Sequence, residues 1–197
     1  MKKLFYSLFM LAIMSLTFVA CEPKEPKAES NCDFFTATYA PDEDGKAMYV
    51  LEFSTNGLDI ANGTGTGEYL VVMMYGEPSE NGFPTPKTYN YIGFDELAYM
   101  ETWEDCLMGG YPMDESSIIG TFMYVIENDT PTDVLLCTDG TVTFEGNTTK
   151  GSMKANLEFV SGITGDIVEK EYIYNGAFNF IESKENAPIA KRIQPIK

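Results

Sequence analysis

Histidine is absent from all 197 residues of this sequence. Without imidazole, the chain cannot build nucleophilic sites in which histidine activates serine or cysteine, nor the usual histidine-ligated zinc sites. Its four cysteines contain no Cys-x-x-Cys pair that would supply thiolate ligands instead. We therefore expect no metal centre and no cofactor, and a catalytic site would have to use other groups, such as carboxylates.

Basic side chains are also scarce, with 13 lysines and arginines against 30 aspartates and glutamates, and the net charge is −17. Such an acidic surface repels phosphate backbones, so nucleic acid is excluded as a partner. The same charge could attract cations or basic proteins, or it could serve only to keep the protein soluble.

Charge is missing from the N-terminal segment between Lys3 and Glu22. Two lysines are followed by the uncharged run Leu4–Ala20, and small residues precede Cys21. This order is typical of a secretory signal peptide. The alternative is an uncleaved membrane helix, but the run is shorter than the ~20 residues that span a bilayer.

The motif Phe18-Val19-Ala20-Cys21 resembles the cleavage site of bacterial lipoproteins. The resemblance implies that residues 1–20 are removed as a signal peptide and that a diacylglyceryl group is attached to Cys21. Residues 21–32 would then form a polar, lipidated tether, which two prolines keep extended. The expected partner of Cys21 is the membrane, because two or three acyl chains hold a protein there stably. A signal peptide without lipidation is the alternative.

Aromatic residues are abundant, with 12 tyrosines and 13 phenylalanines, and they favour strands over helices. The clearest strand is Met153–Phe159, where apolar and polar residues alternate. Glu68–Tyr75 is a continuous apolar run, which predicts a central strand covered on both faces. Thr138–Gly140 predicts a turn between two other strands. At least eight short strands predict an all-β, antiparallel β-sandwich, jelly-roll-like or an open barrel, over residues 33–181, with 182–197 as a tail.

One stretch departs from the strand pattern. Apolar residues recur there at the spacing of one helix face, and Gly109-Gly110 follows as a stop; the residues are Phe94, Leu97, Met100, Trp103 and Leu107. We therefore expect a short helix near residues 95–107, in an insertion that caps the sheet.

Several segments resemble a group of uncharacterised lipoproteins from gut Bacteroidetes, namely 83–91, 140–144, 151–159 and 171–180. This resemblance implies an antiparallel β-sandwich and carries no established activity. Glu22 and Glu25, directly after the cysteine, also resemble the acidic surface-export signal of such lipoproteins. They imply a lipid-anchored outer-membrane protein, with the cell surface favoured over the periplasmic face.

The insertion holds the only tryptophan and a mixture of aromatic and acidic residues that suits a sugar, whose apolar faces stack on rings while carboxylates fix its hydroxyls. The candidate ligand-binding residues are Tyr99, Trp103, Asp105, Tyr111 and Asp114. The helical stripe is equally consistent with Trp103 being part of the core. We expect a non-catalytic binding module, with glycans as one ligand class, rather than an enzyme.

Two alternatives stay open. The chain could be a structural or accessory subunit of an envelope or surface-fibre complex, with the aromatic segment Tyr172–Phe180 as its docking surface. Dense carboxylates around Trp103 could also form a glycoside hydrolase site, which is the less favoured reading.

Once Cys21 is assigned to lipidation, three thiols remain, those of Cys32, Cys106 and Cys137. An exported compartment permits one disulfide among them. The other expectation is that all three are small buried apolar residues.

Overall fold

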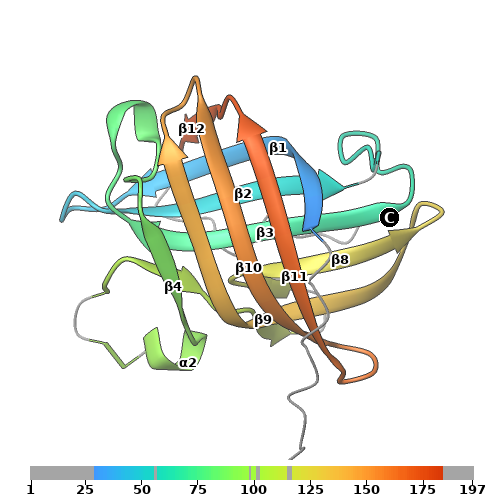
Figure 1. The fold of residues 1–197 in the computed structure, drawn as a ribbon. Helices are drawn as coiled ribbons and strands as arrows, with labels where there is room; N and C mark the ends of the chain where they lie inside the picture. The colour runs from blue at the N-terminus through green and yellow to red at the C-terminus, as the bar shows by residue number, and fades with distance from the viewer. Residues whose placement is uncertain (1–28, 56, 98, 101–102, 115–116, 184–197) are drawn as a thin grey trace, which may run out of the picture.

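A computed structural model describes residues 29–55, 57–97, 99–100, 103–114 and 117–183, and Figure 1 shows their arrangement. This part of the chain is nearly all β. Its strands are β1 (Glu29–Pro41), β2 (Ala47–Thr55), β3 (Gly67–Gly76), β4 (Thr88–Ile92), β5 (Cys106–Met108), β6 (Tyr111–Asp114), β7 (Ser117–Ile119), β8 (Phe122–Glu127), β9 (Thr130–Gly146), β10 (Gly151–Ser161), β11 (Ile167–Gly176) and β12 (Phe180–Glu182). The described helical elements are a 3₁₀ turn, η1 (Glu80–Gly82), and a short helix, α2 (Phe94–Leu97).

The main sheet closes on itself into a barrel. Each strand pairs with the next in the order β1, β2, β3, β8, β9, β10, β11, and β11 pairs back with β1. Toward one end, β5 and β4 stand between β3 and β9 in place of β8. The all-β prediction is confirmed, and the sheet is closed rather than open.

The antiparallel prediction is confirmed at most pairings of the main sheet, and three pairings are parallel. The contacts β1–β11, β1–β12 and β4–β5 are parallel. The first has a topological reason, because a closed ring with an odd number of strands cannot alternate in direction all the way round. Six of the seven pairings in this ring are antiparallel, and the seventh, β1–β11, is therefore parallel.

The barrel is flattened into two layers, with β9, β10 and β11 crossing in front of β1, β2 and β3 (Figure 1). The strand directions define its two ends. We call the end where β1 begins the proximal end; it also holds the β8–β9 and β10–β11 turns. The opposite, distal end holds the β1–β2 and β9–β10 turns.

Side chains fill the space between the two layers. The predicted alternation in β10 is confirmed, since its inward residues Met153, Ala155, Leu157 and Phe159 are all fully buried. Rings from different strands meet edge to face, and the Phe34 and Phe53 centroids lie 5.7 Å apart. Burial of these apolar side chains is the main stabilising term of the fold.

A second apolar cluster lies on the outer side of the barrel wall. Its buried members are Met48, Met73, Leu97, Cys106, Met108 and Ile119, from β2, β3, α2, β5 and β7. Along β3, Val72 and Met74 belong to the interior, whereas Met73 belongs to this outer cluster. The prediction that β3 is covered on both faces is therefore confirmed.

The predicted helix near 95–107 is wrong over most of its length. Among the described residues of this stretch, helical geometry is confined to α2, and Cys106–Met108 form β5 between β3 and β4. In this position the neighbouring strands satisfy the backbone groups of β5, a gain that the spacing of apolar residues does not reveal. The segment still covers the sheet as expected, because Leu97 and Trp103 pack in the outer cluster.

The edges of the domain also differ from expectation. Residues 29–32, assigned to the tether, belong to β1, and at the other end the backbone N–H of Ser183 donates to the carbonyl of Tyr39. Residues 1–20, the tether from Cys21 to residue 28, and 184–197 lie outside the described part of the chain. Within that part, no helix has the length and apolar character that a membrane span requires.

The three remaining cysteines follow the second of the two expectations. Cys32, Cys106 and Cys137 are buried and form no disulfide. Burial raises the pKa of the Cys106 thiol to about 11 and those of Cys32 and Cys137 to about 12. All three therefore act as small apolar residues in the folded protein.

Candidate functional site

The five residues singled out by sequence lie on one segment, but the structure gives them different roles. The segment leaves β4 at Gly93, includes α2, β5 and the β6–β7 ribbon, and returns to the barrel at β8. We call residues 93–119 the insertion. It holds four of the eight large apolar side chains that are exposed in the described part of the chain, namely Tyr99, Met100, Tyr111 and Met113.

Trp103 packs in the outer cluster and is only partly exposed. Its indole meets the Tyr75 ring edge to face, with centroids 5.4 Å apart. The indole N–H donates to the carbonyl of Leu97 at 3.0 Å. The indole N–H is therefore already satisfied within the chain. The ring packs between the insertion and β3 and connects the two.

Asp105 is held between two lysines. Its carboxylate lies 3.1 Å from the ammonium of Lys46 and is also bonded to that of Lys87, and its side chain is only 14% exposed. Burial raises the pKa of this carboxyl, but hydrogen bonds from Lys87 and Lys46 outweigh burial and bring the pKa below its ordinary value. Asp105 thus ties the insertion to the starts of β2 and β4.

The other three candidates remain at the surface. Tyr99 is 90% exposed, and Tyr111 is half-exposed, with its ring stacked on Phe94 at a centroid distance of 5.1 Å. Asp114 ends β6 and is exposed. The structure therefore separates the predicted set into two packing residues, Trp103 and Asp105, and three surface residues.

We call the exposed group of Tyr99, Met100, Tyr111, Met113 and Asp114 the insertion surface. Its apolar members are large, and the Tyr111 ring is held in place by Phe94 rather than free to turn. Large apolar side chains exposed along one segment are candidates for contact with a partner. Tyrosine and methionine are also enriched at protein interfaces.

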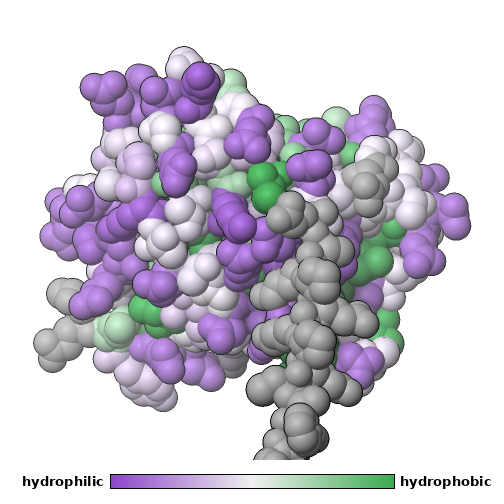
Figure 2. Space-filling view, in the orientation of Figure 1, coloured by the Kyte–Doolittle hydropathy of each residue, from purple (hydrophilic) through white to green (hydrophobic). Residues whose placement is uncertain are grey.

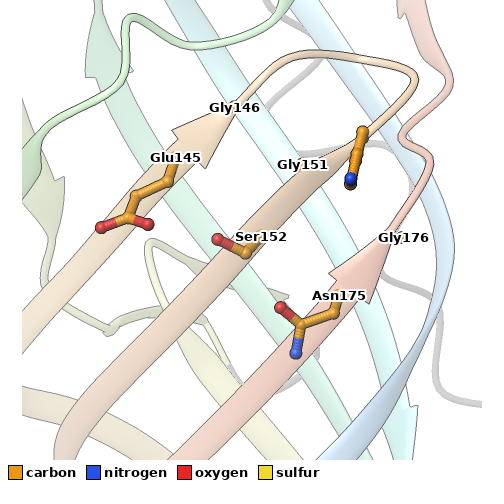
Figure 3. A pocket seen from close by; sticks show the side chains of 7 residues that line it. Glu145, Gly146, Gly151, Ser152, Asn175 and Gly176 are labelled. Carbon is orange, nitrogen blue, oxygen red and sulfur yellow. The ribbon is translucent and has the colours of Figure 1, made fainter.

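A second feature, not anticipated from the sequence, is a shallow hollow at the distal end of β9, β10 and β11. It has a volume of about 450 Å³ and is lined by Glu145, Gly146, Lys150, Gly151, Ser152, Asn175 and Gly176. Figure 3 shows the side chains of Glu145, Ser152 and Asn175 side by side on three adjacent strands. They are direct cross-strand neighbours, since Ser152 pairs with both of the others.

The hollow offers a carboxylate, an ammonium, a hydroxyl and an amide, and three glycines complete its lining. The space-filling view shows that this side of the molecule is largely hydrophilic, with apolar residues in small separate places (Figure 2). Only the register of β9, β10 and β11 brings these polar groups together, so a linear pattern in the sequence gives no sign of the hollow.

Comparison with family models, with curated proteins and with solved structures gives no significant match to this chain. Within the described residues, no three cysteine or carboxylate side chains lie close enough together to hold a metal ion. The functional proposal therefore depends on the surface chemistry of the insertion and of the distal hollow.

Proposed function

We propose that this chain is a lipid-anchored outer-membrane protein, held by acyl chains on Cys21, that binds a partner at the cell surface without catalysing a reaction. The observation that carries the binding role is the insertion surface. Half of the large apolar side chains exposed in the described residues lie within this one segment of the chain. Single exposed apolar residues are ordinary on proteins, whereas a group of them marks a binding site.

Glycans are the ligand class that we propose for this surface. The ring of Tyr111, stacked on Phe94, offers a fixed apolar platform on which the face of a sugar can lie. Tyr99 offers a second ring, and the exposed Asp114 offers a carboxylate that accepts hydrogen bonds from hydroxyl groups. Trp103 and Asp105 would support the site from beneath rather than touch the sugar, because both are occupied by contacts within the chain.

The test is a glycan array probed with the mature chain, followed by titration of any glycan that binds. Tyr99→Ala and Tyr111→Ala are expected to weaken binding by roughly ten-fold each, the loss of about one stacking contact. Phe35→Ala is the matched control, because Phe35 is an exposed aromatic residue on β1, outside the insertion. Equal affinity of all three variants would refute the assignment of the glycan to the insertion surface.

The distal hollow needs its own variant in the same titration. Ser152→Leu would place an apolar side chain between Glu145 and Asn175 without touching the interior. If that variant loses the glycan and Tyr111→Ala retains it, the ligand lies in the hollow. The protein would still be a binding module, but its site would be the one that the sequence did not indicate.

An accessory role in an envelope or surface complex is the second candidate. Met100 and Met113 favour it, because exposed methionines adapt to apolar surfaces of varied shape and suit a protein partner better than a sugar. The docking segment expected from sequence, Tyr172–Phe180, is not available for this role at two positions, since Tyr172 and Phe178 are buried in the interior. Crosslinking from Met113 in intact cells, with recovery of one defined protein, would support this candidate over glycans.

The location is tested by protease treatment of intact cells that carry a C-terminal tag. Loss of the tag with a periplasmic control protein intact supports display at the cell surface. Survival of the tag until lysis would place the domain in the periplasm and would remove most of the support for glycan binding.

A further inference from the structure

The β10–β11 turn carries two strongly exposed isoleucines, at the proximal end of the barrel. Ile163 is 70% exposed and Ile167 is 68% exposed, more than any other large aliphatic side chain in the described residues. Neither belongs to the interior or to the outer cluster. Two such exposed side chains, four residues apart at one turn, are candidates for a contact outside the chain.

The turn that presents them is well ordered by hydrogen bonds. The Ser161 hydroxyl accepts the backbone N–H groups of Ile163 and Thr164, at 3.2 and 3.0 Å, and itself donates to the Asp133 carboxylate at 2.6 Å. The N–H of Gly162 donates to the carbonyl of Val134 at 2.8 Å. The chain therefore holds Ile163 in its exposed position instead of leaving it free to fold back.

The position of the turn relative to β1 indicates what it faces. β1 runs parallel to β11, and Glu29 lies beside Glu171. Ile167 is four residues before Glu171 along β11, so it lies about 13 Å beyond Glu29, past the N-terminal end of β1. The turn thus projects beyond the first described residue of β1 at the proximal end.

The length of the preceding chain allows this turn to reach the same surface as Cys21. Eight peptide units separate Cys21 from Glu29, and they span at most about 29 Å when fully extended. A turn that projects about 13 Å past Glu29 covers nearly half of that reach. An anchor on Cys21 would therefore hold the exposed isoleucines close to the lipid.

We propose that the β10–β11 turn contacts the lipid surface to which the chain is anchored, with Ile163 and Ile167 inserted among the lipid headgroups. This inference rests on the proposed anchor at Cys21. The contact would fix the orientation of the barrel, with its proximal end on the membrane and the distal hollow facing away from it. Asp166 and Asp129 lie in the proximal turns, so the contact suits zwitterionic lipids better than anionic ones.

The experiment uses the full mature chain, isolated from membranes and reconstituted into phosphatidylcholine vesicles that contain lipids brominated near the headgroup. Ile163→Trp places a fluorophore in the turn. Ile181→Trp is the matched control, because Ile181 is also an exposed isoleucine but lies on β12 beside Thr38, toward the distal end. Trp103 supplies the same background in both variants.

We expect brominated lipid to quench Ile163→Trp about two-fold more than Ile181→Trp, and the difference to shrink when phosphatidylglycerol replaces half of the phosphatidylcholine. Equal quenching of the two variants would overturn the lipid contact. That result is also the one expected if the turn binds another protein in the cell instead of lipid. Mass spectrometry of the N-terminal peptide tests the acyl anchor on Cys21 separately from the lipid contact of the β10–β11 turn. An acylated Cys21 with equal quenching refutes the turn contact alone, whereas a chain without acyl groups refutes both.

Discussion

Replacing Asp105 with alanine distinguishes a structural residue from a ligand-binding residue at the centre of the predicted site. The carboxylate binds Lys46, which directly precedes β2, and Lys87, which directly precedes β4. It therefore connects the starts of these two strands to the start of β5. Asp105→Ala would leave both ammonium groups without this partner and would release the insertion from the distal end. We expect the free energy of unfolding to fall and the affinity for a glycan to stay the same.

The size of the loss follows from how exposed each partner is. The contact with Lys46 joins side chains that are 27% and 14% exposed, so it is worth about 1 kcal/mol as a partly buried ion pair. Lys87 is 38% exposed, and solvent screening reduces its contribution to about 0.5 kcal/mol. Asp105→Ala is therefore expected to cost about 1–2 kcal/mol in total.

The assay is urea unfolding followed by the fluorescence of Trp103, with Glu104→Ala as the control. Glu104 is the exposed neighbour, and its replacement removes the same charge from this acidic chain. The difference in unfolding free energy between the two variants should become smaller in high salt, because screening weakens ion pairs. It should also narrow in acid: the folded pKa of Asp105 is depressed, so its contribution is present above about pH 4 and lost as pH falls through the folded value. Equal unfolding free energies for the two variants would refute the stabilising role of the ion pairs that Asp105 makes with Lys46 and Lys87.

Four further outcomes are expected. Trp103→Ala should lower the free energy of unfolding by about 2 kcal/mol, because it removes a partly buried indole. Far-UV circular dichroism in urea measures this loss. The affinity of any glycan bound at Tyr99 and Tyr111 should be retained. Tyr49→Phe should raise stability by about 1 kcal/mol in the same assay, because the Tyr49 hydroxyl is buried without a hydrogen-bond partner in the described structure; a loss would indicate a partner such as a buried water. A thiol reagent at pH 8 should leave the folded protein unmodified and label it only in urea, at Cys32, Cys106 and Cys137, because burial keeps the three thiols protonated. Unfolding should also become easier above pH 9, where these thiols ionise only in the unfolded chain.

The parts of the fold that were predictable from sequence are those decided by local burial. The alternation in β10 and the apolar run of β3 each describe how many faces of a strand are covered, and both predictions are confirmed. Thr138–Gly140, expected to be a turn, instead forms a bulge inside the long strand β9, where the register with β10 shifts next to Phe159. A glycine and an aspartate favour either outcome, and only the pairing partner decides between them.

The candidate site divides in the same way. The sequence located the insertion and its aromatic residues correctly, but periodicity alone could not tell a ring that packs, such as Trp103, from a ring that is displayed, such as Tyr99. The difference arises because β5 pairs with β3 and thereby holds Trp103, three residues before β5, against Tyr75 on the barrel wall. The hollow at Ser152 depends on the register of three strands and has no counterpart in any local pattern.

The filled interior limits where this protein can bind anything. A barrel of this size can hold a small ligand inside if its inward side chains leave room. Here large inward side chains such as Tyr49, Phe53, Phe144 and Phe159 are fully buried and pack against one another across the two layers. Binding is therefore expected on the outside of the barrel, where the insertion surface and the distal hollow offer different chemistry. If the proximal turn rests on lipid, the distal hollow faces away from the membrane and the insertion lies along the side wall, so both surfaces stay open to partners that approach from solution.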